Sequence, residues 1–90
     1  MKTRKVVINE CYGGFGLSDE ARVLLGAGYE YDWDIERDDP KLVEVVEKLG
    51  AEANGRHARL KVVEIPKDVI WFIRNYDGKE HVAELHRTWL

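Results

Sequence analysis

A glycine-rich stretch near the start of the chain has the composition of an anion-binding loop. It follows an apolar run, residues 5–9 (KVVIN), and ends at Ser18, where the sequence favours the start of a helix. Free backbone N–H groups and the positive end of a helix would then meet where a phosphate can be held. The sequence predicts a site for a nucleotide or another phosphate-bearing small ligand, with an aromatic ring to stack on a base. Its candidate residues are Tyr12, Gly13, Gly14, Phe15, Gly16 and Ser18.

The same glycines also suit a structural turn from a strand into a helix, in which they adopt positive φ angles. Gly14 and Gly16 supply two glycines of a dinucleotide-binding fingerprint, but Asp19 stands at the third position. Asp19 and Glu20 would also place negative charge beside a phosphate. The turn and the ligand site are both open interpretations.

A second candidate site is an acidic row in which carboxylates alternate with aromatic and aliphatic residues. The period of two over residues 29–36 (YEYDWDIE) predicts a strand with its carboxylates on one face. Such a face either contacts a partner protein or is a solvated surface neutralised by a neighbouring strand. The lack of His or Cys nearby in sequence argues against a metal site. The carboxylates concerned are Glu30, Asp32, Asp34 and Glu36.

The patterns that could support catalysis are incomplete. Cys11 follows the first apolar run, a position from which nucleophiles act in α/β folds, but no local Cys–His signature accompanies it. Glu84 and His86 form another pair, without the spacing of a hydrolytic metal motif. We therefore predict no catalytic residue, no metal and no cofactor. A small enzyme using Cys11, or Glu84 with His86, is the third alternative for the function.

Composition limits the class of protein. Ninety residues, 44% of them hydrophobic, predict one domain over residues 1–90 with a buried core. A net charge of −3 argues against direct nucleic-acid binding. No apolar run approaches the roughly 20 residues of a membrane span, so we expect no membrane partner. The single cysteine, Cys11, fits the reducing cytoplasm.

Periodicity and turn residues predict the elements that carry these sites. Strands are expected at 5–9, 29–36, 60–65, 69–76 and 79–87, and helices at 19–25 and 40–49. The last strand also has apolar residues at helical spacing, but Asp77-Gly78 before it predicts a type I′ hairpin. The order β-α-β-α-β-β-β predicts an α/β (α+β) fold. We expect a compact two-layer domain with a mixed five-stranded sheet, a C-terminal antiparallel meander and two helices on one face.

The predicted strand at 69–76 is apolar on both faces. Ile70 and Phe72 lie opposite the other apolar residues of this strand. Such a strand is either covered within one chain or forms an interface, including one between the copies of a homodimer. Trp89 near the C-terminus either closes the core or contacts a partner.

Three segments together resemble a family of small phage and prophage proteins. They are CYGGFGLS from Cys11, DPKLVEVVEKLG from Asp39 and YDGKEHVAELHRTW from Tyr76, and the similarity covers nearly the whole chain. The resemblance implies a viral setting, in the cytoplasm of a host cell, and implies no chemistry. Since the catalytic patterns are only partial, we predict a non-catalytic binding protein that contacts a host or viral partner protein. Its predicted contact residues are Glu30, Asp32, Asp34, Glu36, Ile70, Phe72 and Trp89.

Overall fold

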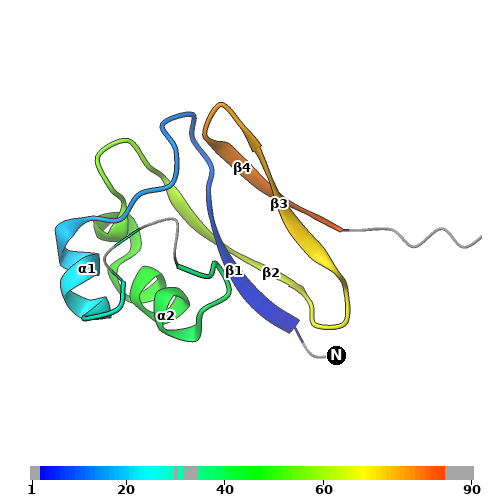
Figure 1. Ribbon diagram of the computed structural model, residues 1–90, viewed down its shortest axis with the longest axis horizontal. Coiled ribbons are helices and arrows are strands. Elements are labelled where there is room, and N and C mark those ends of the chain that lie inside the picture. The colour runs from blue at the N-terminus through cyan, green and yellow to red at the C-terminus, as the bar shows by residue number, and fades with distance from the viewer. Residues whose placement is uncertain (1–2, 30, 32–34, 85–90) are drawn as a thin grey trace, which may run out of the picture.

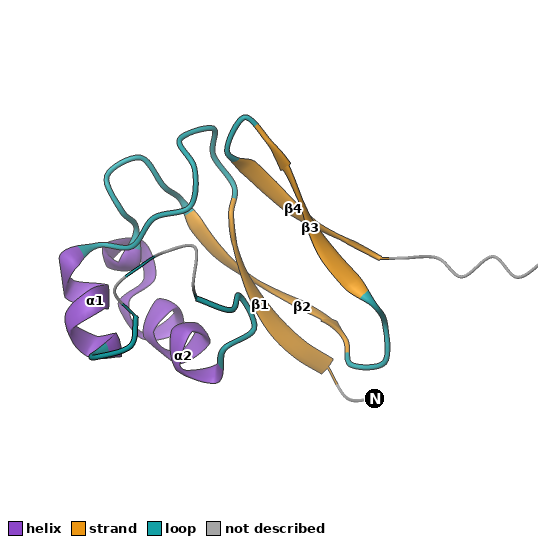
Figure 2. Ribbon diagram, in the orientation of Figure 1, coloured by secondary structure: helices purple, strands orange, loops and turns teal. Residues whose placement is uncertain are grey.

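The computed structural model describes residues 3–29, 31 and 35–84 of the chain (Figure 1). Figure 2 distinguishes the helices, strands and loops of these residues by colour. The elements are β1 (Thr3–Asn9), α1 (Asp19–Leu25), α2 (Pro40–Leu49), the 3₁₀ helix η2 (Gly50–Ala53), β2 (Leu60–Pro66), β3 (Trp71–Tyr76) and β4 (Lys79–Glu84).

The strands in the described part of the chain form two separate antiparallel pairs. β1 pairs with β2, from Thr3 opposite Pro66 to Asn9 opposite Leu60, and β3 pairs with β4. The predicted α+β class is therefore confirmed, but the predicted mixed five-stranded sheet is wrong. The hairpin of β3 and β4 does not extend the sheet of β1 and β2, because it packs across the face of that sheet instead of along its edge (Figure 1).

The segment predicted as the second strand does not form one in its described residues. Tyr29, Tyr31, Ile35 and Glu36 lie outside any strand, and the other positions of 29–36 lie outside the described residues. Arg37, the residue that follows this segment, accepts a backbone hydrogen bond from Val7 N–H of β1 (2.8 Å), without a regular ladder. Alternation of apolar and acidic residues therefore does not by itself place a segment in a sheet.

The apolar residues of β1 explain why the pair β1–β2 is covered on both faces. Val7 is fully buried against the two helices, while Val6 and Ile8 are buried on the opposite face against the hairpin. Burying each such side chain contributes roughly 1.5–3 kcal/mol to the free energy of folding, so covering both faces of the sheet stabilises the domain. Two helices on one face are as predicted, but the hairpin adds a third layer where two were expected (Figure 2).

The ends of the helices and the hairpin turn follow their sequence signals. Ser18 caps α1 by accepting a hydrogen bond from Ala21 N–H, and Asp39 caps α2 by accepting from Lys41 N–H. Asp77 and Gly78 have φ angles of 51° and 92°, both positive as a type I′ turn requires, so that prediction is confirmed. Neither α1 nor α2, nor any other helix in the described residues, is long and apolar enough to cross a membrane.

Candidate functional site

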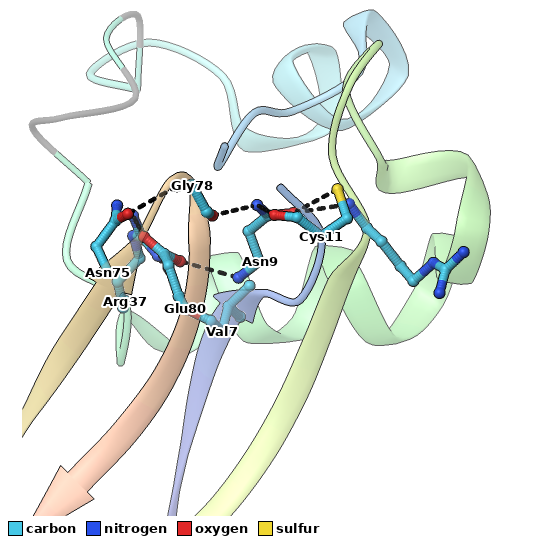
Figure 3. Close-up of polar contacts among 8 residues, drawn as sticks. Val7, Asn9, Cys11, Arg37, Asn75, Gly78 and Glu80 are labelled. Carbon is cyan, nitrogen blue, oxygen red and sulfur yellow. Dashed lines mark hydrogen bonds and ion pairs between the residues drawn. The ribbon is translucent and has the colours of Figure 1, made fainter. Parts of the chain in front are cut away.

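A buried ion pair joins the hairpin to the rest of the domain (Figure 3). The Arg37 guanidinium donates two hydrogen bonds to the Glu80 carboxylate, Nη1 to Oε1 at 2.5 Å and Nη2 to Oε2 at 2.9 Å. The Glu80 side chain is only 4% exposed and that of Arg37 only 19%. The Phe15 ring lies against the guanidinium, 3.7 Å from its central carbon to the ring centroid. This bidentate geometry is the strong form of a charged pair, and it fixes β4 against residue 37.

Asn9 extends this contact into a polar cluster at the end of β1. Its side chain is fully buried and donates from Nδ2 to the carbonyl oxygens of Cys11 and Gly78, both at 2.7 Å. Its Oδ1 accepts from Arg59 N–H at 2.8 Å, and its own N–H donates to Glu80 Oε1 at 2.9 Å. One side chain therefore holds the glycine loop, the hairpin turn and the start of β2 together, as Figure 3 shows.

The glycines of the predicted ligand loop serve close contacts between backbones. A Cβ added at Gly13 would lie 1.7 Å from the His57 carbonyl oxygen, and one at Gly55 would lie 2.7 Å from the backbone of Gly16. Gly78 in the hairpin turn is equally close to the backbone of Gly14. Three loops thus meet where side chains do not fit. Of the loop glycines only Gly14 has the positive φ angle (92°) expected of a structural turn, so close backbone approach is the reason for the glycine at Gly13.

The other residues of the predicted ligand site are also engaged, with one exception. The Ser18 hydroxyl caps α1 and donates to the Glu52 carbonyl at 2.6 Å, and the Phe15 ring contacts Arg37. Tyr12 is exposed, with Lys79 Nζ 5.5 Å from its ring centroid. These contacts give most of the loop a structural role, and binding of a phosphate-bearing ligand there stays a prediction.

The residues considered for catalysis do not come together in the described part of the chain. The Cys11 thiol donates to the His57 carbonyl oxygen at 3.0 Å and lies 3.4 Å from Asn9 Oδ1, so its neighbours are oxygens and not an imidazole nitrogen. His86 and the side chain of Glu84 lie outside what the structure describes. Among the described side chains no group of His, Cys, Asp and Glu is arranged to hold a metal ion.

The predicted contact residues divide between described and undescribed positions. Glu30, Asp32, Asp34 and Trp89 lie outside the described residues, while Glu36 is exposed. Ile70 and Phe72 are 50% and 39% exposed, although both are large apolar residues. Among the described residues nothing covers these two side chains completely, so this face is partly open to solvent.

The register of the hairpin defines this surface. Phe72 pairs with Ala83, Arg74 with His81, and Tyr76 with Lys79, so these six side chains share the face turned away from β1 and β2. We call these six residues the outward hairpin face. Tyr76 is 72% exposed, and the Arg74 guanidinium lies 5.7 Å from the Phe72 ring centroid.

Sequence reasoning found only Phe72 of this face. Arg74, Lys79, His81 and Tyr76 were missed, although a two-residue turn at Asp77-Gly78 fixes which residues pair across the hairpin. Strand parity from that turn would have placed Arg74, Lys79 and His81 on the same side as Phe72.

These features define a small α+β domain with a buried polar cluster and an exposed, aromatic and cationic hairpin face. No protein-family model, no curated protein and no solved structure matches the chain.

Proposed function

We propose that the chain is a non-catalytic binding protein that contacts a partner protein through the outward hairpin face. One observation carries this proposal: Phe72 and Tyr76, on one face of β3, and Ile70 directly before the strand are large apolar side chains left exposed on the same hairpin. Large apolar side chains grouped on one exposed surface are typical of interaction sites. The resemblance to phage proteins supports a host or viral protein as the partner.

The contacts on the buried side of the hairpin hold the outward hairpin face in place, so binding there should cost little conformational freedom. The opposite face of the hairpin packs in the core through Trp71, Ile73 and Val82, and the buried pair of Arg37 and Glu80 fixes β4. A surface that is held in place before binding loses less entropy when a partner docks. The outward hairpin face is thus a preformed surface.

The composition of the face also fits a binding hot spot. Aromatic residues and arginine are enriched among the residues that dominate the binding energy of protein interfaces. The outward hairpin face contains Phe72, Tyr76 and Arg74 within one strand. Six residues are fewer than the roughly 20–30 per side of a standard interface, so neighbouring surface must complete the contact.

Affinity capture from a bacterial lysate tests the proposal with a matched pair of variants. Phe72→Ser removes an exposed apolar side chain from the face, and Val23→Ser removes one from α1, where Val23 is 78% exposed. We expect Phe72→Ser to abolish retention of a specific partner and Val23→Ser to retain it. Val23→Ser should melt within a few degrees of the wild type, because Val23 is largely exposed, and Phe72→Ser, at a side chain that is 39% exposed, is compared only after its melting curve shows that it is folded.

Unchanged capture by a variant that carries both Ile70→Ser and Phe72→Ser would show that the hairpin face is not the contact. Loss of capture in Val23→Ser as well would point to a general effect on the protein and would equally count against the proposal.

A further inference from the structure

We infer that the partner segment that meets the outward hairpin face is an acidic stretch of polypeptide, an inference that rests on the proposed function. The face carries the cationic side chains of Arg74 and Lys79 together with His81, and no Asp or Glu is among its six residues. Interfaces are arranged so that potentials of opposite sign meet. A partner that docks on this face therefore gains from presenting carboxylates to it.

The positions of the cations strengthen this charge argument. Arg74 lies 5.7 Å from the Phe72 ring and Lys79 lies 5.5 Å from the Tyr12 ring. Neither cation has a carboxylate partner among the salt bridges of the described residues. Both charges are thus placed beside apolar rings, where a partner's carboxylate and apolar side chain can be received together.

A polypeptide fits the surface better than a nucleic acid does. Residues 10–52 contain twelve Asp and Glu against four Lys and Arg, a net charge of −8. A nucleic acid, with a phosphate about every 3.4 Å along each strand of a duplex, would carry its charge beyond the hairpin and be repelled by that acidic part. A short acidic segment places its charge on the cationic face alone, and its apolar side chains can contact Phe72.

Fluorescence anisotropy with three labelled probes tests the inference. The first probe is a ten-residue peptide that alternates Glu with Leu and Phe, and the second replaces every Glu by Gln. The third is a ten-nucleotide oligo-dT. We expect the acidic peptide to bind at least about fivefold more tightly than its Gln counterpart, since two exposed ion pairs together give a factor of that order. The difference should shrink when NaCl is raised from 50 to 200 mM.

Charge-neutralising variants identify the residues responsible. The double variant Arg74→Gln/Lys79→Gln should bind the acidic and neutral peptides equally, whereas Lys48→Gln, an exposed lysine on α2, should keep the wild-type preference. Equal binding of the two peptides to the wild type, or no binding of either, would overturn the inference. Tighter binding of oligo-dT than of the acidic peptide would overturn it in favour of a nucleic acid.

The outcome is separable from that of the proposed function. If capture of a protein partner depends on Phe72 while Arg74→Gln/Lys79→Gln leaves that capture unchanged, the proposed function stands and the acidic partner is refuted. If capture does not depend on Phe72, the proposed function fails whatever the peptides do.

Discussion

Removal of the buried carboxylate of Glu80 is the sharpest test of how the hairpin is held. Glu80→Ala deletes the acceptor of two hydrogen bonds from Arg37 and one from the Asn9 N–H. The Arg37 guanidinium, 19% exposed, is then left without its counter-charge. Breaking a buried pair in this way costs about 3–5 kcal/mol. A domain of this size has roughly 5–15 kcal/mol of stability, so the variant should lose much of it.

The measurement is urea unfolding at pH 7, followed by far-ultraviolet circular dichroism and by tryptophan fluorescence. A double-mutant cycle with Glu80→Gln and Arg37→Met separates the pair from the rest of the network. Glu80→Gln keeps an oxygen for the Asn9 N–H, so it removes charge with little change in shape. Each single variant leaves one charged group without its counter-charge, and the double variant contains neither charge. We therefore expect the double variant to be more stable than the sum of the single losses predicts, by about 2 kcal/mol.

An exposed ion pair in the same chain is the matched control. Lys5 Nζ lies 2.8 Å from Glu47 Oε2, at about the same distance as the buried pair, but both side chains are more than two-fifths exposed. Glu47→Gln should therefore have no measurable effect on the free energy of unfolding, because solvent screens the pair. The reasoning is refuted if Glu80→Ala is no more destabilising than Glu47→Gln, or if the effects at Arg37 and Glu80 are additive.

Two further predictions concern local contacts. Gly13→Ala should lower the free energy of unfolding by about 3 kcal/mol, because its Cβ would overlap the His57 carbonyl. Gly14→Ala should lower it by about 1–2 kcal/mol, because of the positive φ angle alone. Equal urea midpoints for the two variants would contradict the close approach at Gly13. The Tyr29 hydroxyl donates to Asp39, and this hydrogen bond, followed by burial, raises the pKa of Tyr29 above its ordinary value of 10.0. A raised pKa means that the stabilisation is complete below about pH 10 and is lost as the pH rises through the folded-state pKa. The difference in melting temperature between wild type and Tyr29→Phe should therefore be constant from pH 7 to 9 and shrink as the pH rises above 10.0; a difference that does not shrink would exclude the hydrogen bond as its cause.

Signals confined to a few neighbouring residues predicted their structures well. Ser18 and Asp39 are the helix caps they were expected to be, and Asp77-Gly78 forms the expected hairpin turn. Each of these depends on a side chain or a φ angle acting on the backbone within three residues. The sequence contains all the physical information that such a local feature needs.

Contacts between distant segments were not predictable in the same way. Arg37 belongs to a charged run, ERDD, and Glu80 to a strand with charged neighbours, so both look like ordinary surface residues. Their pairing depends on the hairpin folding back over β1, which joins positions 43 residues apart. The loop glycines were open to two readings for the same reason. Only the approach of His57 shows why Gly13 has no side chain.

Strand parity nevertheless links the buried cluster to the exposed face. Glu80 pairs with Asn75 on the side of the hairpin that also carries Ile73 and Val82, so its charge points into the domain. Burying a charge there is unfavourable unless a partner meets it, and Arg37 does so from outside the hairpin. A shift of β4 by one residue would expose Glu80 and bury its cationic neighbour instead. The buried pair therefore favours the same register as the Asp77-Gly78 turn, the one in which Lys79 faces outward, and the surface proposed to bind a partner depends on a contact that the partner never touches.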